Sequence, residues 1–328
     1  MKQVYKIKAS ALLRSFLLAV FAINIAACAA LQTSKTPTPP LRLGFTQRWG
    51  DYTLVAAQKQ KLFEKYGVKV ELIYYETLSS IYPDLASGQI DGAIMAIGDI
   101  INVNRNAEMK AVAVSDNGGN AAIVARANIN TVEDLKGEKI GVLIGSQFDL
   151  MVTDMLRSAA ISSNDVSLIT VNPEDAVSVL KNNQVQAVFT YEPFLSDAIA
   201  DGNKILYPDE PKNLFPNMIV FRKSITDKRP NDIRAFLQAW FDAVEYRAQN
   251  PVQINLIAAN YTNRDIGDVK QDEYLKIYTL IDNKVLFNVQ GENSVFTTAK
   301  QTIDYLISIG VISQMVDPLV LLDPTYLP

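Results

Sequence analysis

Two ten-residue stretches, LASGQIDGAI at Leu85–Ile94 and LKNNQVQAVF at Leu180–Phe189, decide the fold of this chain. Each begins with leucine, reaches a residue that tolerates left-handed backbone geometry (Gly88 or Asn183), and continues through glutamine into an apolar run. Each stretch therefore predicts the end of a helix followed by a strand. The pattern occurs twice, about 96 residues apart, which indicates an internal repeat.

The flanking sequence extends both copies. In the first, LRLGFT and VKVELIYY are typical of strands, Tyr52–Tyr66 predicts a helix that Gly67 ends, and Ser80–Ser87 predicts a second helix. In the second, apolar runs at Ile140–Val142 and Val166–Asn172 take the equivalent places. The order β-α-β-α-β predicts a parallel sheet with helices on its faces. Two copies predict two similar α/β lobes, because a solenoid needs three or more.

Helix signals set the expected lobe boundaries. Thr131-Val132-Glu133-Asp134 is similar to a capping box, closed at Gly137, and Asn172-Pro173 offers an N-cap with a first-turn proline. We therefore expect lobe 1 over residues 41–130 and lobe 2 over 131–215, with the chain crossing between them near 127–138 and 208–222. Residues 216–328 are expected to return to lobe 1 and end in helices. Two crossings make a hinge.

The C-terminal part is predicted to be mostly helical. Its helices have one face to bury, so Trp240 is expected in the core rather than at a ligand. Helical spacing relates the apolar residues Ile233, Phe236, Leu237, Trp240 and Val244, and again Phe296, Ala299, Ile303 and Leu306.

The N-terminus predicts export. Residues 1–27 carry four cations, no acid and an apolar run that ends in small residues, which is typical of a secretory signal peptide. Ile25-Ala26-Ala27-Cys28 resembles a bacterial lipobox, so Cys28 is expected to be acylated, with residues 28–40 forming a flexible tether. The alternative is an ordinary cleavage site with an incidental cysteine. The expected location is extracytoplasmic, anchored to a membrane by lipid.

Composition narrows the chemistry. One cysteine and no histidine exclude an internal disulfide, Cys/His zinc sites and Ser-His or Cys-His catalytic pairs, so no metal and no cofactor is expected. Residues 28–328 keep all 35 Asp and Glu but only 27 of the 31 Lys and Arg, for a formal net charge of −8. This balance argues against nucleic acid as a partner.

Lobe 1 offers two candidate ligand-binding loops, because ligands of open parallel sheets collect at the carboxyl ends of the strands. Gln47, Trp49 and Tyr52 lie in QRWGDY, and Asp99 follows the third strand. Trp49 could equally cover the edge of the sheet. For Arg48 we favour a solvated loop charge.

Lobe 2 offers the matching loops. Gly145, Ser146 and Gln147 open a helix, and Tyr191 and Glu192 follow a strand. Ser146 could simply be an N-cap, and Tyr191-Glu192 an ordinary turn before proline.

Two further features concern chemistry. DNGGN, which contains Asn117 and Gly118, is first of all a tight turn. Asp99 and Glu192 fall beyond equivalent strands, so a paired-acid enzyme is considered, but nothing else in these loops supplies a proton relay. A cationic group on a ligand explains the acids more simply, and no catalytic activity is expected.

Four segments carry a family resemblance: LFEKYGVKVELIYYE, LASGQIDGAIM, IVARANINTVEDLKGEKIGVLIGS and VQAVFTYEP. Together they resemble the nitrate/sulfonate/taurine and thiamine-precursor substrate-binding proteins of ABC importers, from about Leu41 to Phe221. The resemblance implies a type II periplasmic-binding-protein fold, with Gln47, Trp49, Tyr52, Asp99, Asn117-Gly118, Gly145-Ser146 and Glu192 lining the cleft. Asp116 and Asn120 replace the acid and serine that members often carry in the turn, and a cysteine-rich motif of the related pyrimidine synthases is absent.

The expected function is that of a monomeric solute receptor. It would bind one small anionic or zwitterionic solute of the sulfonate, taurine or nitrate class and deliver it to the permease subunits of an ABC importer. An aromatic heterocycle such as a thiamine pyrimidine precursor is the alternative ligand. An enzyme built on the same scaffold is the third possibility.

Overall fold

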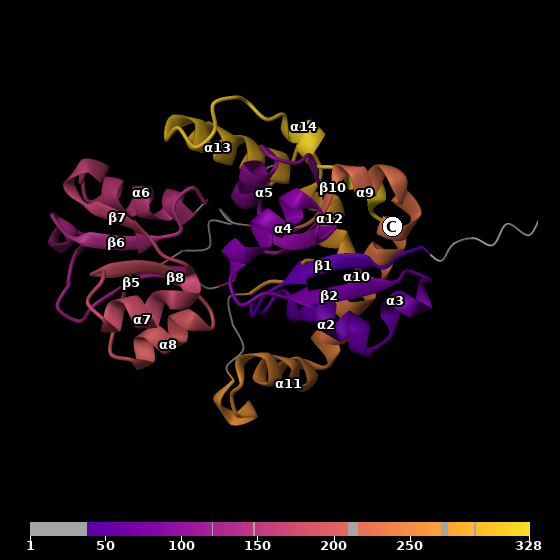
Figure 1. Cartoon of the computed structure of the whole chain (residues 1–328), viewed down its shortest axis with the longest axis horizontal. Coiled ribbons are helices and arrows are strands. Elements are labelled where there is room, and N and C mark those ends of the chain that lie inside the picture. The colour runs from indigo at the N-terminus through magenta and orange to yellow at the C-terminus, as the bar shows by residue number, and fades with distance from the viewer. Residues whose placement is uncertain (1–37, 120, 147, 209–215, 270–274, 292) are drawn as a thin grey trace, which may run out of the picture. The chain divides into compact units, whose positions relative to one another are not determined.

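Two mixed five-stranded sheets organise the chain. The computed structural model describes residues 38–119, 121–146, 148–208, 216–269, 275–291 and 293–328, of which Pro40–Pro328 form one compact unit. Sheet A has the order β2-β1-β3-β10-β4 and sheet B the order β7-β6-β8-β5-β9 (Figure 1). The strands are β1 (Leu41–Phe45), β2 (Val70–Tyr74), β3 (Gly92–Ala96), β4 (Met109–Asp116), β5 (Ala121–Ala125), β6 (Lys139–Val142), β7 (Ser167–Thr170), β8 (Ala187–Tyr191), β9 (Lys204–Pro208) and β10 (Asn217–Arg222).

The two sheets confirm the internal repeat. Strands β1, β2 and β3 are parallel, as are β6, β7 and β8, and each set follows the same spatial order. The fourth strand of each sheet comes from a different part of the chain. In sheet A it is β10, which runs antiparallel to β3, and in sheet B it is β5, which runs antiparallel to β8. Gly88 and Asn183 both have positive φ, at 86° and 56°, which is the left-handed helix end that the quoted stretches predicted.

The crossings between the sheets follow from strand pairing. Because β5 pairs with β8 and β9, the chain enters sheet B just after β4 ends at Asp116, earlier than the expected crossing near 127–138. The return lies between β9 and β10, within the expected range of 208–222. We therefore place the start of the second lobe at β5 rather than at residue 131.

Helices cover both sheets. The α-helices are α2 (Tyr52–Lys59), α3 (Leu62–Lys65), α4 (Ile81–Ser87), α5 (Ile97–Val103), α6 (Phe148–Ser158), α7 (Ala176–Lys181), α8 (Phe194–Ala200), α9 (Lys223–Lys228), α10 (Pro230–Gln249), α11 (Pro251–Thr262), α12 (Leu280–Leu286), α13 (Val295–Ser308) and α14 (Pro318–Leu321). Short 3-10 turns are η1 (Leu78–Ser80), η2 (Val132–Leu135), η3 (Ser163–Asp165), η4 (Pro173–Asp175), η5 (Ile266–Asp268) and η6 (Pro324–Tyr326).

Most helix predictions are confirmed, with one difference. The helix expected over Tyr52–Tyr66 is two helices, α2 and α3, because Lys61 takes a left-handed conformation with φ 56°. The turn allows Phe63 to stack on Phe236 of α10, with 5.5 Å between ring centroids. Thr131 forms the predicted capping box, with Asp134 as its partner.

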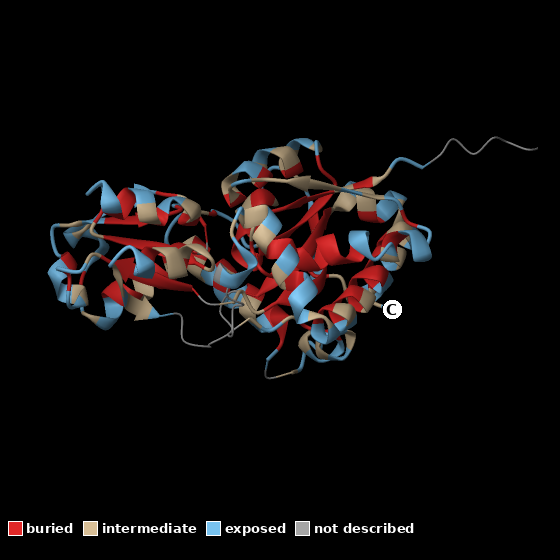
Figure 2. Ribbon diagram, turned by 90° about the horizontal axis from the view of Figure 1, so that it is seen from below, coloured by how far each residue is buried: buried red, intermediate tan, exposed pale blue. Residues whose placement is uncertain are grey.

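The core fills both sheets and the predicted helix faces. Figure 2 shows buried residues along the strands and on the inner sides of the helices that cover them. Trp240 is fully buried, as expected, and so are Ile233 and Phe236 of α10 and Ile303 of α13. One apolar cluster includes Met95 and Met218 of sheet A as well as Phe189 of sheet B. The two lobes therefore share buried apolar surface.

Several predictions fall outside the described residues. These are the signal peptide, Cys28, the tether up to residue 37, and Gln147. Among the helices that the structure does describe, none has the length and apolar character needed to span a bilayer.

Candidate functional site

A cavity of about 170 Å³ opens between residues of both lobes. Trp49 and Tyr52 reach it from the loop after β1 and the start of α2, and Glu192 reaches it from the loop after β8. Three predicted site residues from two separate sheets therefore face one space. The full lining is Trp49, Tyr52, Glu192, Pro193, Ser196, Asp197, Ala200, Ala258, Thr262, Arg264 and Val269.

Contacts with helices α10 and α11 fix the aromatic side of the cavity. The Trp49 carbonyl accepts a hydrogen bond of 2.7 Å from the Arg247 guanidinium of α10, and Trp49 meets Tyr52 edge to face, with centroids 5.7 Å apart. Tyr52 in turn stacks on Tyr261 of α11 at 6.1 Å. Such aromatic contacts fix the ring of Trp49, which is 5% exposed. Trp49 thus combines both interpretations from the sequence, because it packs in the core and also lines the cavity.

The Tyr52 hydroxyl lacks a hydrogen-bond partner among the described residues, although Tyr52 is only 1% exposed. Burial, and then the charge of Asp51, raise the pKa of Tyr52 far above its ordinary value, so the phenol is neutral. A buried phenol without a partner is costly unless a ligand or water supplies one.

The acidic side comes from sheet B and α8. Glu192 Oε1 accepts from the Ser196 hydroxyl at 2.8 Å, and Oε2 accepts from the Ser196 backbone N–H at 3.2 Å. Asp197, one residue on, forms an ion pair with Arg264. Arg264 follows α11, so this pair joins sheet B's helix layer to the C-terminal part of the chain.

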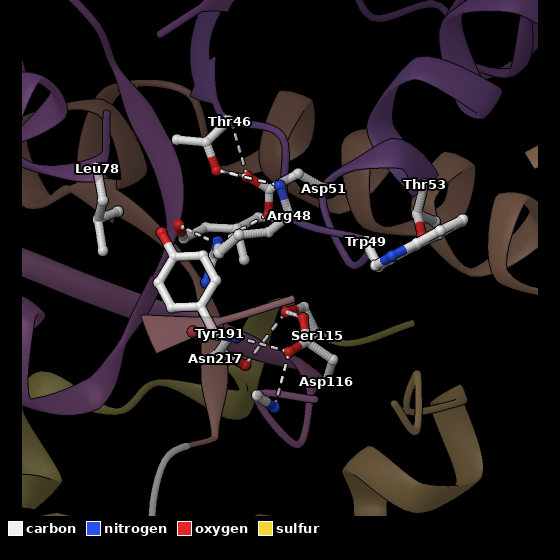
Figure 3. A network of polar contacts seen from close by, with 12 residues as sticks. Thr46, Arg48, Trp49, Asp51, Thr53, Leu78, Ser115, Asp116, Tyr191 and Asn217 are labelled. Carbon is white, nitrogen blue, oxygen red and sulfur yellow. Dashed lines mark hydrogen bonds and ion pairs between the residues drawn. The ribbon is translucent and has the colours of Figure 1, made fainter. Parts of the chain in front are cut away.

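Arg48 is buried, so the preference for a solvated loop charge was wrong. It is 8% exposed, and its Nη2 donates to Asp51 Oδ1 and to the Ile94 carbonyl, both at 2.8 Å. Figure 3 shows Arg48 beside Thr46 and Asp51, pointing away from Trp49. Burial disfavours the charged guanidinium, but the charges of Asp51 and Asp116 outweigh it and raise the pKa of Arg48.

The predicted turn Asn117-Gly118 lies where the chain leaves sheet A. Asp116 Oδ1 accepts from the Gly118 N–H at 2.9 Å and from the Asn217 amide at 2.6 Å. The Asn117 side chain accepts from the Lys276 N–H at 2.9 Å. These bonds shape the turn, whose Gly118 has φ 95°, and neither Asn117 nor Gly118 lines the cavity.

The predicted loop Gly145-Ser146 opens α6 in lobe 2. Ser146 Oγ accepts from the Phe148 N–H at 3.1 Å, which is the N-cap interpretation, and donates to the Leu143 carbonyl at 2.7 Å. The Gly145 N–H donates to Asp149 Oδ2 at 2.7 Å. Burial raises the pKa of Asp149 from 3.8 to about 6, partly offset by this bond. The Gly145 carbonyl accepts from Asn102 of α5 at 3.2 Å, which links the lobes.

Tyr191 and Asp99 are buried and do not line the cavity. The Tyr191 hydroxyl donates to Glu174 Oε1 at 2.7 Å, and the same oxygen accepts from the Leu78 N–H of lobe 1 at 3.1 Å. Asp99 is 1% exposed at the start of α5, and burial followed by the Asp99 charge raises the pKa of Tyr82. Only Glu192 of the proposed acid pair lines the cavity.

Gln47 donates to the Tyr74 hydroxyl at 2.6 Å and is not part of the lining. Sequence reasoning missed Ser196, Asp197, Thr262 and Arg264, which line the cavity. Ser196 and Asp197 could have been found, because they lie in the first turn of the helix after Glu192. Thr262 and Arg264 had no such signal, since their position depends on where α11 packs. No group of three or more potential metal ligands occurs among the residues that the structure describes.

The chain belongs to the NMT1-like family, which matches residues 34–260. It is 23% identical over 202 residues to the taurine-binding periplasmic protein of Escherichia coli K12, covering 60% of this chain and 63% of that protein. The periplasmic nitrate-binding protein NrtA of Synechocystis PCC 6803 has a TM-score of 0.74 at 16% identity, covering 88% of this chain and 87% of NrtA. The aliphatic sulphonate-binding protein SsuA of Escherichia coli has a TM-score of 0.69 at 20% identity, covering 86% of this chain and 92% of SsuA. These similarities confirm the predicted family and the two-lobed periplasmic-binding-protein fold.

Proposed function

We propose that this protein is the extracytoplasmic solute-binding component of an ABC import system. Its two lobes would close on one small anionic or zwitterionic solute and deliver it to the permease subunits. The observation that carries this proposal is the shared cavity, in which Trp49 and Tyr52 of lobe 1 face Glu192 of lobe 2. Family membership and the names of the similar proteins, which bind taurine, nitrate and sulphonates, support it.

The size of the cavity sets the size of the solute. Its volume of about 170 Å³ is close to the roughly 150 Å³ of an engineered cavity that takes up benzene. This volume favours a solute of the size of taurine, a short alkylsulfonate or a single heterocyclic ring over a larger one such as a disaccharide or a peptide.

The remaining parts of the proposal concern location. Cys28 would carry the lipid anchor, with the preceding segment removed as a signal peptide and the body held outside the cytoplasm as a monomer. Replacement of Cys28 by serine should move the protein from the membrane fraction to the soluble fraction. We propose no catalytic role for this protein. The alternative is an enzyme that uses Asp99 and Glu192 as a pair of acids. If an activity were found and it survived replacement of both residues, that mechanism would be excluded.

The experiment that tests the proposed function is a thermal-shift panel of taurine, alkylsulfonates, nitrate, bicarbonate and formylated aminopyrimidines. A ligand present at 100 times its dissociation constant stabilises the folded protein by about 2.7 kcal/mol. No shift with any of these compounds would count heavily against the proposed solutes.

The aromatic wall favours a second candidate ligand, an aromatic heterocycle stacked on Trp49. In that case Trp49→Ala should weaken binding by roughly 1 kcal/mol or more, because the ring contact is lost. Undiminished affinity in this variant would favour the smaller solutes. Tyr261→Phe is a suitable control, since this residue supports Tyr52 without lining the cavity.

A further inference from the structure

The ion pair between Arg264 and Asp197 joins the two sides of the cavity. Asp197 belongs to α8, which packs on β5 and β8 of sheet B. Arg264 follows α11, which packs on α2 and α10 of the other lobe. Both side chains line the cavity. A charge pair therefore bridges the cavity wall of lobe 1 and the cavity wall of lobe 2.

The backbone fixes the position of Arg264. Asn263 ends α11 in a left-handed conformation, with φ 53°, and the Arg264 N–H donates to the Ala259 carbonyl at 3.1 Å. A helix end of this kind sets the direction in which the chain leaves the helix. The guanidinium therefore reaches Asp197 from a defined point of the backbone, although the Arg264 side chain is 29% exposed.

Arg264 also borders a second hollow, which is more open to solvent than the cavity. This hollow has a volume of about 710 Å³ and is lined by Ala259, Asn260, Asn263, Arg264 and Asp265. Among the described residues that line either space, Arg264 alone lines both. A small molecule that moves from the hollow into the cavity therefore passes the Arg264 side chain.

We propose that Arg264 and Asp197 form a gate, which closes the cavity while they are paired and admits a small molecule when they separate. The two side chains are 29% and 35% exposed, so water can replace each partner when the pair opens. An ion pair with this exposure changes the balance of open and closed forms by a factor of about two to five. The gate rests on the proposed solute-binding function for its use, but its opening needs no solute.

Trp49 can report on the gate, because it lines the cavity and is 5% exposed. The chain has two tryptophans, and the other, Trp240, is fully buried. Acrylamide, a small neutral quencher of tryptophan fluorescence, should therefore reach Trp49 only as often as the gate opens. The variant Trp49→Phe measures the quenching of Trp240, which is then subtracted.

The first arm of the test uses the unchanged full-length protein over a series of NaCl concentrations. The Debye length falls from about 10 Å at 0.1 M salt to about 3 Å at 1 M, which weakens a partly exposed ion pair. The quenching constant of Trp49 should rise about two-fold over this range, whereas that of Trp240 should not change. A constant value for Trp49 would overturn the gate.

The second arm uses variants of the pair. Arg264→Met keeps the length of the side chain without its charge, so quenching in low salt should rise about two- to five-fold and no longer depend on salt. Asp197→Asn should give a similar rise, and the double variant no further rise, because both changes break one contact. Asp265→Asn removes an exposed acid beside Arg264 that does not line the cavity, and should match the wild type.

The remaining outcomes decide whether the pair controls access. If quenching of Arg264→Met equals that of the wild type, or if Asp265→Asn gives the same rise, the gate is overturned. If the rises of the single variants multiply in the double variant, the two residues act separately and the gate is again overturned. Because no solute takes part, these failures leave the proposed function untouched, and a failed thermal-shift panel leaves the gate untouched. The salt series does not depend on how the variants fold.

Discussion

Asp149, in the first turn of α6, shows how a single buried residue can make stability depend on pH. Its carboxylate is 7% exposed, and burial raises its pKa from 3.8 to about 6 in the folded protein. The folded state therefore binds this proton more readily than the unfolded chain does between about pH 4 and pH 6. Stability from this group is complete at the low end of that window and declines as pH rises through it.

The variant Asp149→Asn tests this directly. The amide keeps an oxygen that accepts from the Gly145 N–H but does not ionise, so the pH-dependent term disappears. The free energy of unfolding of the wild type, relative to the variant, should fall by up to roughly 3 kcal/mol between pH 4 and pH 7, since two pKa units correspond to about that value. Urea unfolding of both proteins at each pH measures the difference, and a constant difference across the range would contradict the prediction.

Arg48 marks the limit of sequence reasoning at the scale of the residue. Its sequence neighbours Trp49 and Tyr52 line the cavity, because residues in a strand-to-helix loop of this fold lie near the carboxyl edge of the sheet. The burial of Arg48 could not be inferred, since it depends on the Ile94 carbonyl, 46 residues away, as well as on Asp51. A charge in a loop is predicted to be solvated unless its tertiary partners are known.

At the scale of the element, the two copies of the repeat differ where strand pairing demands it. Gly92 of LASGQIDGAI aligns with Ala187 of LKNNQVQAVF. In sheet A the residue opposite Gly92 is Phe221, whereas in sheet B the residue opposite Ala187 is Ala125. The glycine leaves room for the phenylalanine ring opposite it, whereas the alanine faces another small side chain, so each copy suits its own neighbouring strand.

Gly92→Ala is therefore expected to destabilise sheet A. The new Cβ would lie 2.6 Å from the Val220 carbonyl oxygen and 2.6 Å from the Phe221 ring, and the backbone of β10 cannot move away easily. Overpacking of this kind costs about 1–3 kcal/mol. The control is Gly267→Ala, whose Cβ meets no atom within 4 Å. Urea unfolding should show the loss only for Gly92→Ala, and equal values for the two variants would refute the packing argument.

The elements themselves were largely predictable, because hydrophobic period and turn residues are local. The parallel strands, the helix ends at Gly88 and Asn183, and the buried face of α10 all follow from such patterns. The break between α2 and α3 did not, since it depends on Phe63 meeting α10, which lies much later in the chain. The position of the first crossing between the sheets could not be predicted from local patterns either, because only the partners of β5 show to which sheet it belongs.

At the scale of the whole molecule, polar contacts join parts of the chain that are far apart in the sequence. Arg264 was not predicted because nothing in its local sequence tells where α11 packs, and yet its pair with Asp197 connects the C-terminal part of the chain to α8. Ser79 of lobe 1 also donates to Asn172 of lobe 2 at 2.7 Å. The two lobes are therefore joined by specific polar contacts as well as by shared apolar surface.

Glu174 is the residue at which the proposed closure of the two lobes can be tested. One carboxylate oxygen accepts from the Leu78 N–H of lobe 1 and from the Tyr191 hydroxyl of lobe 2. Glu174→Ala leaves the Leu78 N–H of lobe 1 without this acceptor, at a cost of about 1–3 kcal/mol in the closed state only, because in the open state water can replace it. The bond from Tyr191, which lies in the same lobe as Glu174, is lost in both states and does not change their balance. Since a ligand binds the closed state better, its dissociation constant should rise about ten-fold or more.

Small-angle X-ray scattering and calorimetry together check this expectation. Glu174→Ala without ligand should have a larger radius of gyration than the wild type, and saturating ligand should bring the two values together. Glu174→Gln keeps one acceptor oxygen and should give a smaller effect, while Glu133→Ala, at an exposed position of the same lobe, should give none. If Glu174→Ala matched the wild type both in radius of gyration and in affinity, Glu174 would have no part in closure, because a contact that differs between the open and closed states must shift their populations.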